Sequence, residues 1–218
     1  MENTINNKVF LMGQVDSEPV FSHEMYSEGF YDFFIKVKRL SGQYDIIPVT
    51  ASERLMKDKL KIGDNVGING QFRSYNKLEN GKSKLMLTVF VRDFIEYDEQ
   101  ENNPNIVELN GYVCKEPVYR TTPFNREICD VLLAVNRSYN KSDYIPCIAW
   151  GRNARYAKNI EIGKLVTITG RIQSREYNKK LEDKIEVRTA YELSVNKIEC
   201  KALEGEEIAS TLDESAII

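Results

Sequence analysis

Asp143-Tyr-Ile-Pro-Cys-Ile-Ala-Trp-Gly-Arg152 is the stretch from which the fold can be read. It is an apolar strand that ends in Trp150, the only tryptophan of the chain, and is followed by a glycine and an arginine. A large ring beside a turn and a cation can stack on a planar ligand while the cation meets the ligand's charge. Because a single tryptophan more often belongs to a hydrophobic core, the ligand interpretation needs a second observation.

The second observation is that the stretch occurs twice. An earlier copy, Asp45-Ile-Ile-Pro-Val-Thr-Ala-Ser-Glu-Arg54, lies 98 residues upstream and has no ring at the place of Trp150. Further matches follow in the same order: Val9-x-Leu-x-Gly-x-Val-x-x-Glu-Pro-Val20 with Val107 to Val118, and Gly63-x-x-Val-x-Ile-x-Gly70 with Gly163 to Gly170 at an offset of 100. So many matches in one order indicate an internal duplication.

In each copy, the alternation of apolar and polar residues and the turn residues predict three strands, a short helix and two strands, in that order. This is the element order of the OB-fold. The strands expected in the first copy are 8–15, 30–38, 44–51, 65–73 and 84–91, with a helix from Ser52 to about Leu60. Those expected in the second copy are 106–113, 127–136, 143–150, 165–173 and 184–195, with a helix near 152–160. We therefore predict an all-β chain with short helices, made of two tandem five-stranded OB-fold barrels.

The domain boundaries follow from shifts in composition. The stretch from Glu96 to Asn105 is acidic and polar, and the residues after Glu199 are charged and weakly patterned. We expect a first OB-fold domain at 1–97, a linker at 98–105, a second OB-fold domain at 106–199 and a short acidic tail at 200–218.

Composition narrows the class of protein. No apolar run reaches membrane-spanning length and no basic-then-apolar leader is present, so we expect a cytoplasmic protein without membrane contact. The four cysteines all lie in the second half of the chain without CxxC spacing, which favours free thiols. With one histidine, His23, and no P-loop or nucleophile elbow, the sequence predicts no metal site, no cofactor and no enzyme.

Four segments of the second copy share residues and order with a known family. They are Leu109-x-Gly-x-Val-x-x-Glu-Pro117, Leu133-Ala-Val-Asn-Arg-Ser-Tyr139, the stretch from Asp143 to Arg152, and Gly170-Arg-Ile-Gln-Ser-Arg-x-Tyr177. They resemble the bacterial single-stranded DNA-binding proteins, and the first copy does so more faintly. The resemblance implies a tandem form of a family that coats single-stranded DNA in replication, recombination and repair. It places the family's base-stacking rings at Tyr139, Tyr144, Trp150 and Tyr177.

The duplication gives a check on these rings. The first copy has Ser41, Ile46 and Ser52 at the places of the first three rings, and Tyr75 is interpreted as the counterpart of Tyr177. Because the first copy keeps its core pattern without three of the rings, we interpret the rings as ligand contacts. The first domain is then predicted to have a degenerate ligand site and a mainly structural or assembly role.

Charge supports the same division. Residues 106–180 hold thirteen Lys and Arg against seven Asp and Glu, a net of plus six in a chain whose net charge is −3. A basic domain in an acidic protein suits a polyanionic ligand. The predicted cationic DNA contacts are Arg137, Arg152, Arg171, Arg175 and Lys179. The predicted auxiliary contacts of the first domain are Arg39, Arg54, Arg73, Tyr75 and Lys77. For any one of these cations, a solvated surface of mixed charge is an equal explanation.

Partners follow from the resemblance. Family members act as four barrels, so a chain with two is predicted to form a homodimer. They also recruit replication and repair proteins through a long acidic-tipped tail, whereas this chain ends in Asp213-Glu-Ser-Ala-Ile-Ile218, which leaves such recruitment open. Two other functions stay open: a tandem-OB adaptor that binds proteins in a replication-restart or conjugation assembly, and an RNA or oligosaccharide binder.

Overall fold

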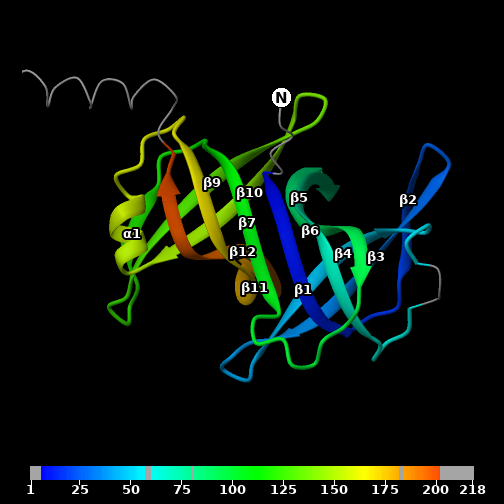
Figure 1. Ribbon diagram of the computed structural model, residues 1–218. Helices are drawn as coiled ribbons and strands as arrows, with labels where there is room; N and C mark the ends of the chain where they lie inside the picture. The colour runs from blue at the N-terminus through cyan, green and yellow to red at the C-terminus, as the bar shows by residue number, and fades with distance from the viewer. Residues whose placement is uncertain (1–5, 57–59, 80, 182–183, 202–218) are drawn as a thin grey trace, which may run out of the picture.

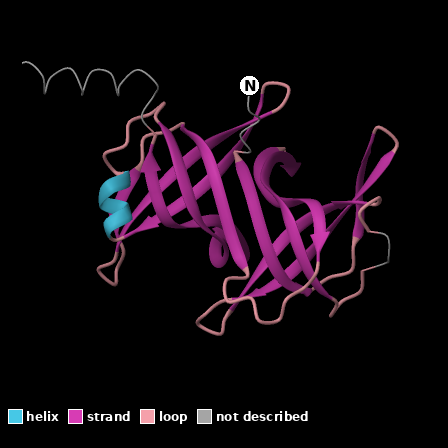
Figure 2. Cartoon of the chain, viewed as in Figure 1, coloured by secondary structure: helices cyan, strands magenta, loops and turns pink. Residues whose placement is uncertain are grey.

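The computed structural model describes residues 6–56, 60–79, 81–181 and 184–201, with the side chains of 179–181 and 184–185 left out. It confirms the predicted all-β class and the two OB-fold barrels, which lie side by side (Figures 1 and 2). The predicted tail lies outside the described residues apart from its first two positions.

The first barrel is formed by strands β1 to β6. Their bounds are β1 Asn7–Val15, β2 Val20–Met25, β3 Glu28–Lys38, β4 Tyr44–Ser52, β5 Asn65–Glu79 and β6 Lys82–Ile95. Five of them close in the order β1-β3-β4-β6-β5-β1, in which only the β4–β6 contact is parallel. This is the strand order of an OB-fold, with β3 and β4 as its second and third strands.

The second barrel repeats this arrangement. Its elements are β7 Asn105–Val113, β8 Val118–Thr121, β9 Glu127–Arg137, β10 Lys141–Trp150, α1 Arg152–Ala157, β11 Leu165–Leu181 and β12 Lys184–Cys200. It closes as β7-β9-β10-β12-β11-β7, again with one parallel contact, between β10 and β12. Strand β7 therefore begins at the last residue of the predicted linker.

Each barrel is filled by the inward half of its alternating strands. On β3 the inward side chains include Phe33, Ile35 and Val37, while on β10 they include Ile145 and Cys147. The residues between them point outward, because successive side chains of a strand lie on opposite faces. This alternation is the pattern on which the strand predictions rested.

The barrels are joined through their first strands. Strand β1 pairs antiparallel with β7, with Val9 opposite Val107, so the described strands form one twelve-stranded sheet (Figure 1). The long hairpins β5–β6 and β11–β12 then reach across to the opposite barrel, since β5 contacts β10 and β11 contacts β4. The surface between the barrels is therefore built by both copies.

Two predictions about local structure were wrong. In the first copy no helix follows β4 within the described residues: Leu55 N–H donates to the Ser52 carbonyl at 3.1 Å, and only a turn forms. In the second copy Gly151 adopts the left-handed region with φ 52°, which ends β10 and lets α1 begin at Arg152. The first copy has no glycine there, and α1 itself stops at Ala157 rather than near 160.

The sequence interpretation also missed β2 and β8, which extend β3 and β9 as edge strands. The β2–β3 connection is a two-residue turn in which Tyr26 and Ser27 both have positive φ, of 53° and 59°. Both central residues of a type I′ turn need positive φ, a role usually filled by Asn-Gly. The absence of that signal is why the hairpin was overlooked. No described helix is long and apolar enough to cross a lipid bilayer.

Candidate nucleic-acid interface

The outward face of β10 carries two of the four predicted rings. Tyr144 and Trp150 alternate with the buried core residues of the strand and remain 46% and 37% exposed. The second and third strands of an OB-fold form its usual ligand surface, and β10 is the third strand of this barrel. The two rings therefore lie where a planar ligand reaches them without any rearrangement.

The third predicted ring stands at the tip of the β9–β10 hairpin. Tyr139 has φ 62° and is 94% exposed, so the turn projects its side chain into solvent. Arg152 is exposed at the start of α1, directly after Trp150 and Gly151. Together these residues extend the outward face of β10 at both of its ends.

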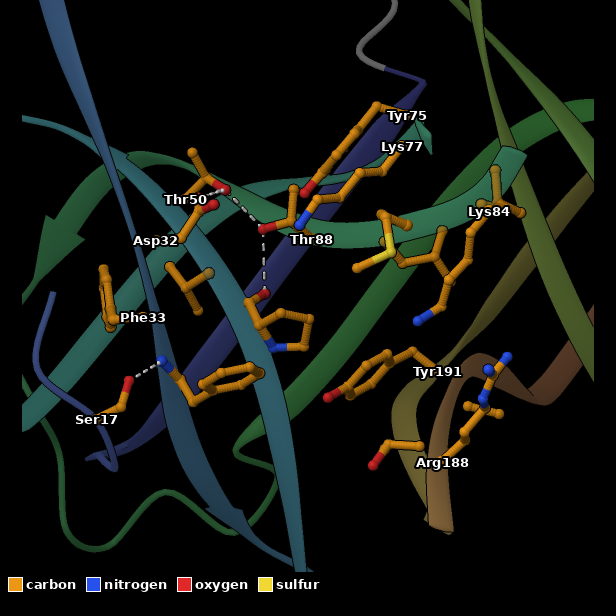
Figure 3. Close-up of a pocket in the computed structure, with 18 of the residues that line it drawn as sticks. Ser17, Asp32, Phe33, Thr50, Tyr75, Lys77, Lys84, Thr88, Arg188 and Tyr191 are labelled. Atoms are coloured by element: carbon orange, nitrogen blue, oxygen red, sulfur yellow. Dashed lines mark hydrogen bonds between the residues drawn. The ribbon is translucent and has the colours of Figure 1, made fainter. Parts of the chain in front are cut away.

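Tyr177 lies elsewhere, in a groove between the barrels. The groove has a volume of about 850 Å³ and is lined by the outward faces of β3, β4, β5 and β6 and by the hairpin of β11 and β12. Figure 3 shows Tyr75 and Lys77 on one side and Tyr191 and Arg188 on the other. Tyr177 is 39% exposed and lines this groove, so the structure brings it together with two residues of the predicted auxiliary site.

The strand register corrects one pairing of the two copies. Val9 lies opposite Gly70 in the first barrel and Val107 lies opposite Gly170 in the second. Counting along β5 and β11 from these glycines places Tyr177 at the position of Lys77 and Arg175 at that of Tyr75. Interpreting Tyr75 as the counterpart of Tyr177 was therefore wrong by two residues. The first copy has no ring at the position of any of the four predicted rings.

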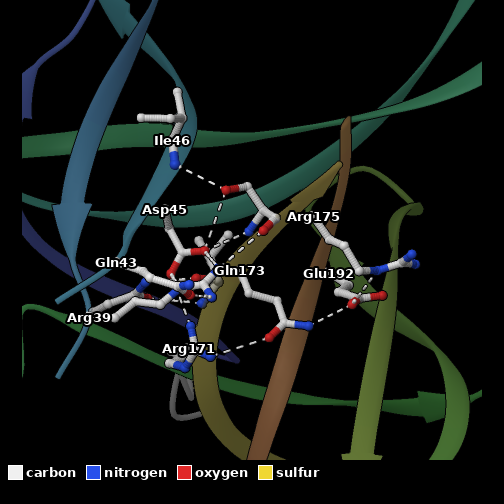
Figure 4. Close-up of polar contacts among 11 residues, drawn as sticks. Arg39, Gln43, Asp45, Ile46, Arg171, Gln173, Arg175 and Glu192 are labelled. Carbon is white, nitrogen blue, oxygen red and sulfur yellow. Dashed lines mark hydrogen bonds and ion pairs between the residues drawn. The ribbon is translucent and has the colours of Figure 1, made fainter. Parts of the chain in front are cut away.

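Two predicted arginines meet one carboxylate at the barrel junction (Figure 4). Asp45 is 1% exposed and pairs with Arg39 and with Arg171, the latter at 3.0 Å. It also accepts the Ser174 N–H at 2.8 Å, and Arg39 donates to the Ser174 carbonyl at 3.1 Å. The hydrogen bond to Asp45 raises the pKa of Arg39, whereas burial lowers the pKa of Arg171. These two guanidinium groups hold the barrels together.

The second copy has a matching junction. Asp143 accepts the Ser74 N–H at 2.8 Å and faces Arg137 at 3.6 Å, while Tyr144 N–H donates to Ser74 Oγ at 2.7 Å. Burial raises the pKa of Asp143, while the Ser74 N–H and the charges of Arg137 and Arg73 act to lower it. Arg137 is therefore placed beside an interdomain carboxylate as well as beside the β10 face.

Arg73 is held by a ring. Its guanidinium carbon lies 3.7 Å from the centroid of Phe90, and burial, followed by repulsion from Arg92, lowers its pKa to about 10. Its Nε is buried without a hydrogen-bond partner. It remains a cation at neutral pH, at the outward face of the first barrel.

The remaining predicted cations are more exposed. Arg175 is 56% exposed, 3.8 Å from Glu192 and 6.0 Å from the Tyr177 ring. Arg54 lies 3.5 Å from Glu28 and Lys77 lies 3.6 Å from Glu79, both as surface pairs. Such pairs contribute little stability and exchange readily for another anion. The side chain of Lys179 lies outside the described residues.

The sequence interpretation missed several rings on the outward face of the first barrel. Phe34 and Tyr44 are 39% and 46% exposed, and Phe90 packs over the face beside Phe30 at 5.7 Å. Alternation along β3 was the available signal, since a strand with Phe33 inward must present Phe34 outward. The description of this face as degenerate compared ring positions, and of the extra rings of the first copy it noted Tyr26, Phe30 and Tyr31 but not Phe34, Tyr44 or Phe90.

The comparisons with known proteins agree with this geometry. Residues 104–201 match the model of the Single-strand binding protein family. Single-stranded DNA-binding protein 1 of Lactococcus lactis is 32% identical over 110 residues, which cover 47% of this chain and 73% of that protein. Single-stranded DNA-binding protein 1 of Staphylococcus aureus is 38% identical over 80 residues, which cover 34% of this chain and 48% of that protein. These matches cover about half of this chain or less.

The likeness in fold extends further. The wild-type single-stranded DNA binding protein from Thermus aquaticus superposes with a TM-score of 0.68 at 20% identity, covering 90% of this chain and 93% of that one. At this identity the likeness concerns the fold alone, but it includes both barrels and their arrangement. From the family match and the lactococcal relative we conclude that the chain belongs to the Single-strand binding protein family.

Proposed function

We propose that this chain is a sequence-tolerant single-stranded DNA-binding protein that coats or protects DNA strands during replication, recombination or repair. The observation that carries the proposal is the pair of exposed rings, Tyr144 and Trp150, on the outward face of an OB-fold strand with Arg152 beside them. Every base has a face that stacks on such a ring, at roughly 1 to 3 kcal/mol per base, so stacking does not depend on sequence.

Cations around these rings would supply the phosphate contacts. Arg152 is exposed directly after Trp150 and Gly151, and Arg137 borders the same face while it pairs with Asp143. Arg175 is also exposed, but it lies 6.0 Å from the Tyr177 ring and would serve a strand in the groove. Each phosphate that they neutralise releases counterions, which makes affinity fall as salt rises. Arg39 and Arg171 we assign instead to the junction, because both are engaged by the buried Asp45.

Binding by stacking and ion pairing needs no bond to be made or broken, so we propose a binding protein rather than an enzyme. Among the described residues no cluster of His, Cys, Asp and Glu could hold a metal ion. We further propose that the protein is cytoplasmic and that it forms a homodimer with four OB-fold domains. Light scattering at micromolar concentration tests the dimer directly.

An adaptor function is supported by the exposed β2 edge. Val20, Phe21 and Met25 are each at least half exposed, at 65%, 56% and 50%, on an edge strand with a free side. Such an edge can pair with an extended segment of another protein. This surface is separate from Tyr144 and Trp150, so it adds to DNA binding rather than replacing it.

The experiment that tests DNA binding uses the fluorescence of Trp150. Titration with oligo-dT at low and moderate salt should quench it strongly, with a log–log salt slope of about −0.7 per phosphate contacted. Matched RNA and neutral oligosaccharide serve as competitors that separate the other OB-fold ligands. Absence of both quenching and binding would overturn the proposal and favour the adaptor function.

A further inference from the structure

We propose that the groove between the barrels is a second single-stranded DNA site, built by rings of the first barrel and of the β11–β12 hairpin. This inference rests on the proposed function and deepens it. The site is the groove between the barrels, with Phe34 and Tyr75 on one wall and Tyr177 and Tyr191 on the other. The first domain is then a binding domain, contrary to the degenerate role predicted from the sequence.

The first argument is the register of the rings. The position of Tyr144 is Ile46 in the first copy, yet Tyr44 stands two residues before it on the same strand. Likewise Lys77 occupies the position of Tyr177, and Tyr75 stands two residues before it. A shift of two residues keeps a side chain on the same face of a strand and moves it by about 6.6 Å. Tyr75 therefore still faces outward and lines the groove, whereas Tyr44 is outward on β4 but does not line it.

The second argument concerns the place of Trp150. Its counterpart Ser52 is buried and bonded to Glu28, and the adjoining surface is filled by Phe30, stacked on His23 at 4.9 Å and packed on Phe90. Phe30 is only 7% exposed, so this corner offers no free ring. Bases on the first barrel must then lie farther along the strands, where Phe34 and Tyr75 are exposed.

The third argument is the distribution of charge in the groove. Lys77 and Lys84 lie at its rim, each paired with Glu79 at 3.6 Å in an exposed contact that a phosphate can replace. Farther in, Asp32 accepts from Thr50 at 2.6 Å, and Thr50 is linked to Thr88 at 2.9 Å (Figure 3). A carboxylate at that place repels phosphate. The strand would therefore insert its bases and keep its phosphates at the rim.

The fourth argument is that the second barrel completes the site. Tyr177 and Tyr191 come from the β11–β12 hairpin, and Tyr177 lies opposite Arg188 in that hairpin. A strand lying on the first barrel would therefore contact rings of both copies. The resemblance had assigned Tyr177 to the second barrel's own site, whereas the groove assigns it to the first barrel's site.

The test counts short oligonucleotides per chain. An OB-fold covers about 4 to 16 nucleotides, so an oligo-dT of roughly 10 nucleotides occupies one site. We expect two oligonucleotides per wild-type chain by isothermal titration, and one in the variant Phe34→Ala with Tyr75→Ala. Quenching of Trp150 by the same oligonucleotide should be unchanged in that variant. Affinity for a strand of about 30 nucleotides should fall roughly 5-fold to 150-fold for each stacked ring removed.

Two further variants complete the design. Tyr177→Ala should weaken the same site as Phe34→Ala and spare the quenching of Trp150. Ile62→Ala, which removes an apolar side chain that is 59% exposed on the first barrel outside the groove, should bind as the wild type does. Circular dichroism and thermal unfolding check that each variant is folded.

The outcomes separate the two proposals. If the wild type binds one oligonucleotide per chain, or if the Phe34→Ala, Tyr75→Ala variant still binds two, the second site is overturned while DNA binding stands. If the wild type binds none, the proposed function itself fails.

Discussion

The two barrels share one framework and differ in what they present on it. Asp45 with Ser174 and Asp143 with Ser74 are the same junction built twice, since each carboxylate accepts a serine N–H at 2.8 Å. The outward faces, in contrast, keep none of the rings at equivalent positions. A duplicated fold thus keeps its closing contacts, because both copies need them, while the rings on its outward faces differ from copy to copy.

The largest expected effect comes from removing the exposed rings of the second barrel, which tests whether the two barrels bind DNA separately. Tyr144→Ala with Trp150→Ala should cost about 2 to 6 kcal/mol of binding free energy at the second barrel, from two stacked bases. The measurement is anisotropy of a labelled short oligo-dT, with one oligonucleotide per chain remaining on the first barrel. Loss of both sites together would show that the barrels do not bind independently.

The next effect compares the two junctions. Asp45→Ala leaves Arg39 and Arg171 without their shared carboxylate, and breaking a buried ion pair costs about 3 to 5 kcal/mol. Asp143→Ala should cost less, because its nearest arginine is 3.6 Å away. Urea unfolding of both variants measures the difference. Equal losses of unfolding free energy in the two variants would contradict the prediction that Asp45 stabilises its junction more than Asp143 does.

A smaller effect concerns the pH dependence of stability at the junction of Asp143. Burial raises the pKa of Asp143 above its value in the unfolded chain, which is about 3.9. The folded state therefore favours the protonated carboxyl, and this contribution to stability is full below that pH and is lost as pH rises through the raised pKa. Thermal unfolding from about pH 3 to pH 7 should show the wild type losing stability relative to Asp143→Asn. Parallel curves would refute the raised pKa.

Salt dependence tests the rim of the groove. Lys77→Ala with Lys84→Ala should reduce the magnitude of the log–log salt slope for long strands by about 1.4, from two lost phosphate contacts. Lys61→Ala serves as the control, because Lys61 is exposed and does not line the groove. An unchanged slope in the double lysine variant would place the phosphates elsewhere.

The smallest effect concerns reactivity within the second barrel, which holds all four cysteines. Burial raises the pKa of Cys129 to about 11 and raises that of Cys147 as well, whereas Cys200 is exposed. A disulfide reagent should therefore label Cys200 quickly and the two buried thiols only as this barrel opens. Fast labelling of Cys147 in the folded protein would contradict its burial.

The alternation of apolar and polar residues, together with the duplication, sufficed to predict the barrels, because every second side chain of a half-buried strand points into the core and is apolar. The same rule explains what was missed. Phe34 is outward by alternation, and the offset of 100 already pairs Tyr177 with Lys77 and not with Tyr75, as the strand register shows. Arg171 was predicted as a DNA contact because it lies next to the stacking positions in the predicted fold. Its pairing with Asp45 was not predicted, since the two residues are 126 positions apart in the sequence. The two residues come together only where the barrels meet, and local sequence patterns do not predict how two domains meet.

The most direct test of a DNA path over both barrels is photo-cross-linking of an oligo-dT of about 30 nucleotides that carries iodinated bases, followed by mapping of the linked peptides. Iodinated bases link preferentially to the aromatic rings on which they stack. We expect links at Tyr144 or Trp150 on the second barrel and at Phe34, Tyr75 or Tyr177 in the groove. Links confined to β10, or found instead on the exposed face of β1 and β7, would contradict a path over both barrels.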